Sequence, residues 1–427
     1  MLKFSENNET IRTEHERVIL VGAELPGKDI SYSMSELAGL ARAAGADVIG
    51  EAVQSLEKVN TATFIGRGKV EELAAYCRAE AADAVIFNEE LSGIQTRNLE
   101  RELKTRVIDR TVLILDIFAL RAKTKEGMLQ VELAQLQYLM PRIAGFDKSL
   151  SRQAGGIGTR GPGETQLETD RRHYIRRMDS IRSELRRMKK TRAVTRKRRE
   201  RSGIPVVALV GYTNAGKSSL MNRMLLEAGR RDKDVYEEDM LFATLDTERR
   251  RIKLGSTHEF ILTDTVGFVS GLPHTLIDAF KATLEEVTEA DLLLEVVDAS
   301  YEGCDFQIEV TDKVMGEIGA GGKDRITVYN KTDLTGPGFL GASPRESVNI
   351  SAKTGENIGQ LLDMIEEHLF SDREAVTLLI PYDKGGLVSY ICDHGIVSSI
   401  EHTAEGTKIT AELIRRDYDK VKKYGIV

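Results

Sequence analysis

The chain has 427 residues, of which 41% are hydrophobic and 30% charged, and its formal net charge is −7. Such a length is too great for one ordinary core and predicts about two to four domains, whereas no apolar run approaches the roughly 20 residues that cross a bilayer. The first nine residues carry acids where a signal peptide needs an apolar core, so we expect a cytoplasmic protein. Three widely spaced cysteines, Cys77, Cys304 and Cys392, show no metal-ligand spacing and are predicted to be buried free thiols.

The order of apolar runs and helical patterns divides the chain into five segments. Short apolar runs alternate with helical patterns from Arg17 to about Asp116, which is typical of an α/β domain with a parallel sheet. Within it, Gly66-Arg67-Gly68 could meet an anion, although a glycine pair alone is a weak signal and a plain turn is favoured. We expect a polar tail at 1–16, this subdomain at 17–116, a helical hairpin at 117–202, a nucleotide-binding domain at 203–371 and a small α+β domain at 372–427.

Two apolar stripes with heptad spacing predict an antiparallel helical hairpin. One stripe holds Leu129, Leu133, Leu136 and Met140, and the other holds Tyr174, Met178, Ile181, Leu185 and Met188. Between the stripes, the segment 141–163 contains too many glycines to form a core. We expect this segment to be a flexible loop that carries arginines.

A strongly basic run lies on the second predicted helix. From Arg171 to Arg201 there are 15 Lys or Arg residues and three acids, which gives this segment a net charge of +12 in an otherwise acidic chain. We interpret the basic helix and the glycine-rich loop as a surface for structured RNA, because phosphate contacts supply affinity and shape supplies selectivity. A solvated linker or a hairpin that docks on a protein is the alternative.

Residues 211–218 carry the clearest chemical signal. They read GYTNAGKS, follow the apolar run 205–210 and precede a helical pattern at 219–226, so they fit the phosphate-binding loop that joins a strand to a helix. In such a loop backbone N–H groups surround phosphate oxygens, Lys217 reaches the β- and γ-phosphates, and Ser218 binds Mg²⁺. We therefore expect a nucleoside triphosphate to contact Gly211, Tyr212, Thr213, Asn214, Ala215, Gly216, Lys217 and Ser218.

Two further motifs complete the predicted phosphate site. They are Phe242, Ala243, Thr244, Leu245 and Asp246, and, further along the chain, Asp264, Thr265, Val266 and Gly267. We expect Asp264 to hold Mg²⁺ through a water and the Gly267 N–H to bond the γ-phosphate. Thr244 and Thr247 are the candidates for a second hydroxyl that coordinates Mg²⁺.

Two motifs that follow later apolar runs predict that the base is guanine. They are Asn330, Lys331, Thr332 and Asp333, and then Ser351, Ala352 and Lys353. The Asp333 carboxylate can accept hydrogen bonds from guanine N1–H and the 2-amino group, for which adenine has no matching donor pair. We expect Asn330 at the N7 and O6 edge, the Lys331 stem on the face of the base, and an N–H of the loop 351–353 at O6. The order of the motifs predicts a doubly wound, mostly parallel α/β domain of the P-loop GTPase kind.

Together these motifs resemble the HflX family of translational GTPases, and the resemblance covers nearly the whole chain. It is carried by residues 155–172, 211–218, 242–246 and 264–268. It implies an N-terminal α/β domain with a helical hairpin, a GTPase domain and a small C-terminal domain. Members of this family bind the large (50S) ribosomal subunit and its rRNA and extend the glycine-rich loop toward the peptidyl-transferase region. In several bacteria they split or rescue stalled ribosomes under stress.

The resemblance also implies functional residues. It places the guanine-nucleotide contacts on the motifs above and the Mg²⁺ ligands on Ser218 and Thr244, so Thr244 is preferred to Thr247. After Asp246 the family usually reads Pro-Thr-Thr, whereas this chain has TER at 247–249. The residues from which we expect catalysis are Lys217, Thr244, Asp264 and Gly267.

Phe268 stands where Ras-type enzymes place the glutamine that orients the attacking water. Because a phenyl ring cannot hydrogen-bond to this water, we expect slow hydrolysis by the isolated chain. The ribosome stimulates hydrolysis in the family, and we expect the same here. The ring could also simply pack beneath the switch.

Two other functions stay open at this point. The N-terminal half could be an ATP-driven RNA-remodelling enzyme that the GTPase regulates, which requires a second nucleotide site. Alternatively, the chain could be a GTP switch whose partner is a protein, and its binding would then show little salt dependence. We expect a monomer.

Overall fold

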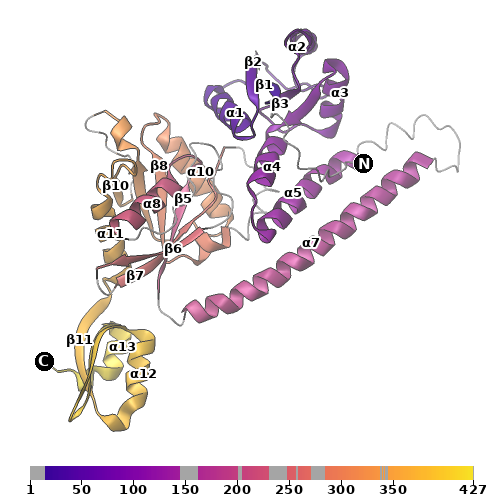
Figure 1. Cartoon of the computed structure of the whole chain (residues 1–427). Coiled ribbons are helices and arrows are strands. Elements are labelled where there is room, and N and C mark those ends of the chain that lie inside the picture. The colour runs from indigo at the N-terminus through magenta and orange to yellow at the C-terminus, as the bar shows by residue number, and fades with distance from the viewer. Residues whose placement is uncertain are drawn as a thin grey trace. The chain divides into compact units, whose positions relative to one another are not determined.

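The computed structural model describes residues 15–144, 162–200, 204–229, 248–255, 258–270, 284–336, 339, 341 and 345–426. These residues contain a four-stranded, a six-stranded and a three-stranded sheet (Figure 1). The chain divides into two compact units. The first comprises residues 1–120 and 135–174, and the second comprises residues 121–134 and 175–427.

The first unit contains the predicted parallel sheet. Its strands lie in the order β2-β1-β3-β4, with β1 at Arg17–Glu24, β2 at Asp47–Ser55, β3 at Ala84–Phe87 and β4 at Arg106–Asp109, and every pair is parallel. The side chains of alternate residues in β1 point to opposite faces of the sheet. Ile19 and Val21 share one core cluster with the helices α2 (Arg67–Glu80) and α3 (Gly93–Leu103). The helix α1 (Ser31–Ala43) contacts β1 and β2 through a buried face that includes Leu37 and Leu40.

The segment Gly66-Arg67-Gly68 forms the start of α2. Gly66 is the N-cap residue, and its N–H donates to the Gln54 side chain at 2.8 Å. This is the plain helix-starting turn that the sequence favoured. The next helix, α3, begins with a reciprocal capping box between Ser92 and Gln95, which satisfies two backbone donors of its first turn.

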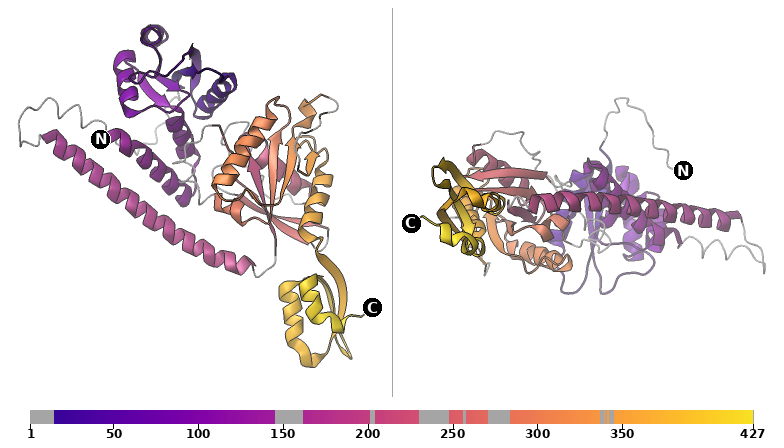
Figure 2. Two further views of the ribbon diagram at one scale, coloured as in Figure 1. Left: turned by 180° about the vertical axis from the view of Figure 1, so that it is seen from behind. Right: turned by 90° about the horizontal axis from the view of Figure 1, so that it is seen from below.

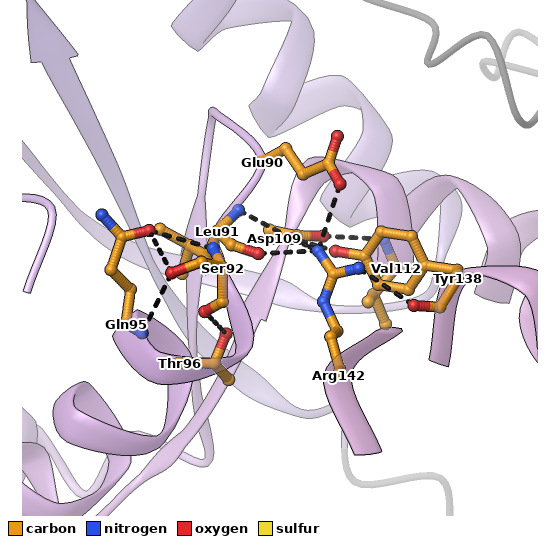
Figure 3. Close-up of polar contacts among 9 residues, drawn as sticks. All are labelled: Glu90, Leu91, Ser92, Gln95, Thr96, Asp109, Val112, Tyr138 and Arg142. Atoms are coloured by element: carbon orange, nitrogen blue, oxygen red, sulfur yellow. Dashed lines mark hydrogen bonds and ion pairs between the residues drawn. The ribbon is translucent and has the colours of Figure 1, made fainter. Parts of the chain in front are cut away.

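A buried carboxylate joins three elements of the first unit (Figure 3). Asp109 accepts hydrogen bonds from the backbone N–H groups of Leu91 and Val112, both at 3.0 Å, so it caps the helix α4 (Arg110–Arg121). It also accepts from the Tyr138 hydroxyl and lies 3.3 Å from the Arg142 guanidinium. Burial, followed by the Asp109 charge, raises the pKa of Tyr138, so the phenol stays protonated as the donor. The Arg142 guanidinium also stacks 3.3 Å from the centre of the Tyr138 ring.

This cluster corrects the predicted start of the glycine-rich loop. The loop was expected to begin at Pro141, but the helix α5 (Lys125–Ala144) continues through that residue. Proline in the last helical turn removes one backbone hydrogen bond, but Arg142 anchors this turn by donating to the Leu91 carbonyl at 2.6 Å. The expected segment boundary at 116/117 is also misplaced as an element boundary, because it falls inside α4. Residues 145–161, which hold most of the predicted loop, lie outside the described residues.

The two helices of the predicted hairpin are α5 and α7 (Pro162–Glu200), and α7 is one long helix in both views of Figure 2. Within the second unit, Arg177 pairs with Glu132 at 2.6 Å and Lys125 pairs with Glu184. The later residue of α5 (Glu132) pairs with the earlier residue of α7 (Arg177), and the earlier residue of α5 with the later residue of α7. The two helices therefore run antiparallel, as predicted.

The second unit contains a six-stranded sheet in the order β10-β9-β8-β5-β7-β6. Its strands are β5 (Val206–Gly211), β6 (Glu248–Leu254), β7 (His258–Asp264), β8 (Leu292–Asp298), β9 (Arg325–Asn330) and β10 (Ser347–Asn349). Among the described strands of this sheet, only the β6–β7 pair is antiparallel, so the doubly wound, mostly parallel sheet is confirmed. The helices α8 (Lys217–Glu227) and α11 (Ile358–Phe370) bury apolar residues against one face. The helix α10 (Cys304–Glu317) packs beside β8 and β5.

The C-terminal part of the second unit is the expected α+β structure. It has a three-stranded antiparallel sheet in the order β11-β13-β12, with β11 at Arg373–Ile380, β12 at Ile396–Thr403 and β13 at Gly406–Ile414. The helices α12 (Gly385–His394) and α13 (Arg415–Val421) share its core cluster. The prediction of three buried thiols is wrong in part. Cys77 is buried, but Cys304 is half-buried and Cys392 is exposed, because it lies about 100° around α12 from the buried Ile391.

His258 is predicted to make stability pH-dependent. Its ring stacks on Phe370 at 4.2 Å and contacts the carboxylates of Glu366 and Glu412. Burial alone lowers the pKa of His258, but the hydrogen bonds to Glu412 and Glu366 outweigh burial and raise it. The stabilisation is therefore complete below the unfolded pKa of about 6.5 and is lost as pH rises through the folded pKa.

The test compares the thermal unfolding of the wild type with that of His258→Gln. We expect the difference in Tm to be greatest at pH 6 and to shrink by about 2 °C at pH 8.5, as for an ion pair worth about 1 kcal/mol. A difference that is constant with pH would contradict the charged interaction.

Candidate functional site

The loop 211–216 joins β5 to α8 at the edge where the parallel strands end. Gly211 and Gly216 adopt φ angles of +135° and +91°, which side chains disfavour. A Cβ at Gly211 would lie 2.2 Å from the Val296 carbonyl oxygen, and one at Gly216 would lie 2.2 Å from the Asn330 amide nitrogen. Both glycines of the motif are therefore required by the approach of neighbouring strands as well as by the loop itself.

Lys217 begins α8 and is buried beneath the loop. Its ammonium donates to the carbonyls of Gly211 and Tyr212 at 3.2 and 2.8 Å. Burial lowers the pKa of Lys217 to about 8, and the nearby Asp264 carboxylate only partly opposes this effect. The cation is thus held at the loop in an environment where an additional anion would be favourable.

Two oxygen groups meet next to this lysine. The Ser218 hydroxyl donates to the Asp264 carboxylate at 2.6 Å, and Asp264 is completely buried at the end of β7. The next residue, Thr265, is also buried and donates to the Leu209 carbonyl at 2.6 Å. These bonds fix the end of β7 against β5 and bring a hydroxyl and a carboxylate together.

The segment after Asp264 runs along the phosphate loop. The Thr213 N–H donates to the Phe268 carbonyl at 2.7 Å, and the Phe268 N–H donates to the Gly211 carbonyl at 3.1 Å. At Gly267 a Cβ would lie 2.6 Å from the Thr213 Cα, so glycine is required for this approach. The Phe268 side chain is only 1% exposed. It therefore packs in the core, which was one of the two interpretations of this residue.

The predicted base-recognition motifs lie together at the same edge of the sheet. The Asn330 side chain donates to the Ala215 carbonyl at 2.9 Å and accepts from the Ala352 N–H at 2.9 Å. The Ser351 hydroxyl donates to the Asp333 carboxylate at 2.7 Å. Asn330 thus connects the phosphate loop to the loop 351–353, and Ser351 connects that loop to Asp333.

A pocket of about 530 Å³ opens between these motifs. It is lined by Asn214, Gly216, Ser219, Asn222, Arg223, Leu226, Asn330, Lys331, Asp333, Leu334, Ala352 and Lys353. The Lys331 ammonium pairs with Asp298 at 2.7 Å, so that the aliphatic stem of this lysine is held at the pocket wall. The pocket combines an apolar stem, a carboxylate and an amide, which is the composition expected for binding a planar polar base.

The structure thus brings together the motifs 211–218, 264–267, 330–333 and 351–353. The remaining predicted site residues, Phe242, Ala243, Thr244, Leu245 and Asp246, lie outside the described residues. Sequence reasoning missed Asp298, which pairs with Lys331, and Arg223, whose guanidinium bonds the loop 351–353. Neither residue belongs to a motif with a fixed spacing, so no local signal could have identified them.

A second candidate surface lies on α7. Arg176, Arg182, Arg186, Arg187 and Lys190 are exposed on this helix, whereas Met178 and Ile181 are buried on its apolar side. Between Arg176 and Lys190 these basic groups therefore face solvent, as a surface for an anionic polymer requires.

Proteins of similar sequence show to which family the chain belongs. A "GTPase HflX" from Caldanaerobacter subterraneus is 46% identical to this chain over 416 residues, which cover 97% of the chain and 95% of that protein. The chain belongs to the GTPase HflX family. The "GTPase HflX" of Escherichia coli is 43% identical to this HflX-family chain over 380 residues, which cover 88% of both proteins.

Four family models match successive parts of this HflX-family chain. They are a GTP-binding GTPase N-terminal region at 31–119, a GTP-binding GTPase middle region at 121–199, a 50S ribosome-binding GTPase at 206–331 and an HflX C-terminal domain at 341–424. The resemblance to the HflX family that the motifs indicated is thereby confirmed, and the chain is a GTPase of this family.

Solved structures are also similar to this HflX-family chain. A GTP-binding protein from the archaeon Sulfolobus solfataricus in complex with GDP is 26% identical, has a TM-score of 0.45, and aligns over 83% of this chain and 98% of its own. In the part of the chain that the structure describes, no helix is long and apolar enough to span a membrane.

Proposed function

We propose that this chain binds GTP at the edge formed by the motifs 211–218, 264–267, 330–333 and 351–353, and hydrolyses it there. The observation that carries this assignment is the pair of hydrogen bonds by which Asn330 joins the phosphate loop to the base loop. A nucleotide that lies across them would have its phosphates at Lys217 and its base at Asp333. Burial of the guanine edge against a carboxylate disfavours a base without matching donors.

We assign Mg²⁺ to the same site. The Ser218 hydroxyl and the buried Asp264 carboxylate are hard oxygen donors 2.6 Å apart, which suits this ion. Ser218 and Thr244 would coordinate it directly and Asp264 through a water. When bound there, Mg²⁺ would supply positive charge against the negative charge that develops in phosphoryl transfer.

The chain's own residues supply only part of the catalysis. Lys217 would neutralise the phosphates, and the Gly267 N–H would bond the γ-phosphate. The buried Phe268 ring offers no group that orients water. We therefore assign the missing contribution to a partner that stimulates hydrolysis.

We propose that this partner is the large ribosomal subunit and its rRNA. Two findings support the proposal: the exposed arginines of α7 and the match of residues 206–331 to a 50S ribosome-binding GTPase model. In this view the basic hairpin and the glycine-rich segment dock on rRNA, and GTP favours the bound state. The chain acts as a cytoplasmic, monomeric factor that splits or rescues stalled ribosomes under stress, and hydrolysis releases it.

GTP turnover with purified large subunits tests this function. We expect subunits to raise the turnover at least tenfold over the chain alone, whereas bulk RNA of equal phosphate concentration has little effect. The stimulation should fall steeply with salt, because phosphate contacts release counterions. Equal stimulation by bulk RNA would contradict specific docking, and stimulation that is insensitive to salt would favour a protein partner.

Charge reversal on α7 provides the matched comparison. One variant replaces Arg182, Arg186 and Arg187 by glutamate, and the control replaces the exposed Lys253, Lys313 and Lys384 by glutamate. Both change the net charge by the same amount. We expect the α7 variant to lose most of the stimulation by subunits and to keep its basal turnover, and we expect the control to retain both. A similar loss in both variants would contradict a role for α7.

A further inference from the structure

Arg223 connects the phosphate-binding helix to the loop 351–353. It lies on α8, which begins at Lys217, and its side chain is half-buried. Its Nε donates to the Ala352 carbonyl at 2.9 Å, and its Nη2 donates to the Lys353 carbonyl. One guanidinium therefore holds two successive carbonyls of a loop that lies more than 120 residues further along the chain.

Gly355 makes this approach possible. It adopts a φ of +91°, and a Cβ at this position would lie 3.3 Å from Arg223 Nη1. A larger residue would be strained in that conformation and would crowd the guanidinium. The turn after Lys353 is thus shaped to admit the arginine side chain.

The two contacts from Arg223 to carbonyls add to other hydrogen bonds that hold the loop 351–353. The Ala352 N–H donates to Asn330, and the Thr354 N–H donates to the Ser351 hydroxyl at 3.1 Å. Because a trans peptide is planar, the carbonyl of Ala352 and the N–H of Lys353 point in opposite directions within one rigid unit. Fixing the carbonyl with Arg223 therefore fixes the direction of the Lys353 N–H.

We propose that Arg223 is a positioning residue for guanine specificity, which it exerts by holding the Lys353 N–H where guanine O6 accepts it. This inference rests on the proposed assignment of the base pocket. The Ala352 N–H is already used by Asn330, so the Lys353 N–H is the donor that we assign to O6. Each hydrogen bond from a guanidinium is strong, and its rigid planar fork holds two acceptors in one fixed geometry, which the rotating donors of a lysine ammonium cannot do.

The test measures nucleotide affinity for wild type, Arg223→Met and Arg223→Lys. Methionine retains an unbranched side chain and removes both hydrogen bonds. The two probes are GDP and 6-thioguanosine diphosphate, an analogue that keeps the N1 proton and the 2-amino group for Asp333 but carries sulfur, a weak hydrogen-bond acceptor, at position 6. We expect Arg223→Met to weaken GDP binding about tenfold and analogue binding less than twofold, with Arg223→Lys between wild type and Arg223→Met for GDP.

Two results would overturn the inference. An equal loss of affinity for GDP and the analogue would mean that Arg223 contacts the ribose or phosphates, or only stabilises the fold. No loss for GDP would mean that the loop is held without it. If Arg223→Met binds the analogue nearly as tightly as the wild-type protein does, the variant is folded and its phosphate loop is intact.

Asp333→Ala separates this inference from the proposed pocket. If Asp333→Ala leaves GDP affinity unchanged, the base pocket itself is wrongly assigned. If Asp333→Ala weakens GDP binding and Arg223→Met does not, the pocket stands and only the role of Arg223 is wrong.

Discussion

Replacing Lys217 by alanine is expected to weaken GDP and GTP binding about 100-fold. The substitution removes a charged donor from a buried site, where its hydrogen bonds to phosphate oxygens contribute about 3 kcal/mol. The stability without nucleotide should change little, because the lost hydrogen bonds to the Gly211 and Tyr212 carbonyls are offset by removal of a buried charge, whose desolvation lowers the pKa of Lys217 to about 8. Isothermal titration calorimetry and thermal unfolding measure the two effects, and unchanged nucleotide affinity would refute the site.

The pH dependence of binding follows from the same lysine. A nucleotide requires the protonated ammonium, and the free protein releases this proton as pH rises through about 8. Above that pH, binding must take up a proton, so GDP affinity should fall with pH and approach a tenfold loss for each further unit. The alanine variant has no such proton and should show no corresponding decline. A wild-type affinity that is constant from pH 7 to pH 9.5 would contradict the lowered pKa.

Replacing Asp333 by asparagine is expected to change the preferred base from guanine to xanthine. Xanthine carries an oxygen where guanine has its 2-amino group, and an asparagine amide can donate to that oxygen while its carbonyl still accepts from N1–H. We expect GDP affinity to fall about 100-fold and the affinity for xanthosine diphosphate to rise above it. The Ser351 hydroxyl, which donates to Asp333 at 2.7 Å, can donate equally to the asparagine carbonyl, so the loop should be preserved.

Asp298→Asn is the matched control for that experiment. Asp298 pairs with Lys331 at the wall of the same pocket, and it is not assigned to the base. Its substitution should lower the affinities for GDP and xanthosine diphosphate by a similar, small factor, so that guanine stays the preferred base. A variant of Asp333 that retains its preference for GDP would contradict the assigned role of its carboxylate.

Much of the fold follows from local sequence patterns. The runs Val206–Gly211 and Leu292–Asp298 are buried along almost their whole length, and continuous apolar runs of this kind predict central parallel strands. The phosphate loop could be recognised because its glycines adopt conformations that only a few residues tolerate. Such restrictions act within a few residues and are therefore visible in the sequence.

The parts that could not be predicted depend on distant contacts. The contact of Arg223 with the carbonyls of Ala352 and Lys353 depends on how two elements pack, and no periodicity encodes it. The continuation of α5 through Pro141 likewise contradicts the local preference, because Arg142 is held by residues of other elements. Local propensity fails at these places because tertiary hydrogen bonds decide the conformation.

The two hydrogen bonds of the Asn330 side chain also influence which ligands the site selects. A guanine nucleotide is a bivalent ligand, with phosphates at one end and a base at the other. One carboxamide bonds the Ala215 carbonyl and the Ala352 N–H, each at 2.9 Å, so the two half-sites are held at a fixed spacing. Once the phosphates bind, the base meets its half-site at a high effective concentration, which only a ligand of matching length can exploit. Guanosine or pyrophosphate alone gains none of this advantage, so the site selects its ligand by length as well as by chemical groups.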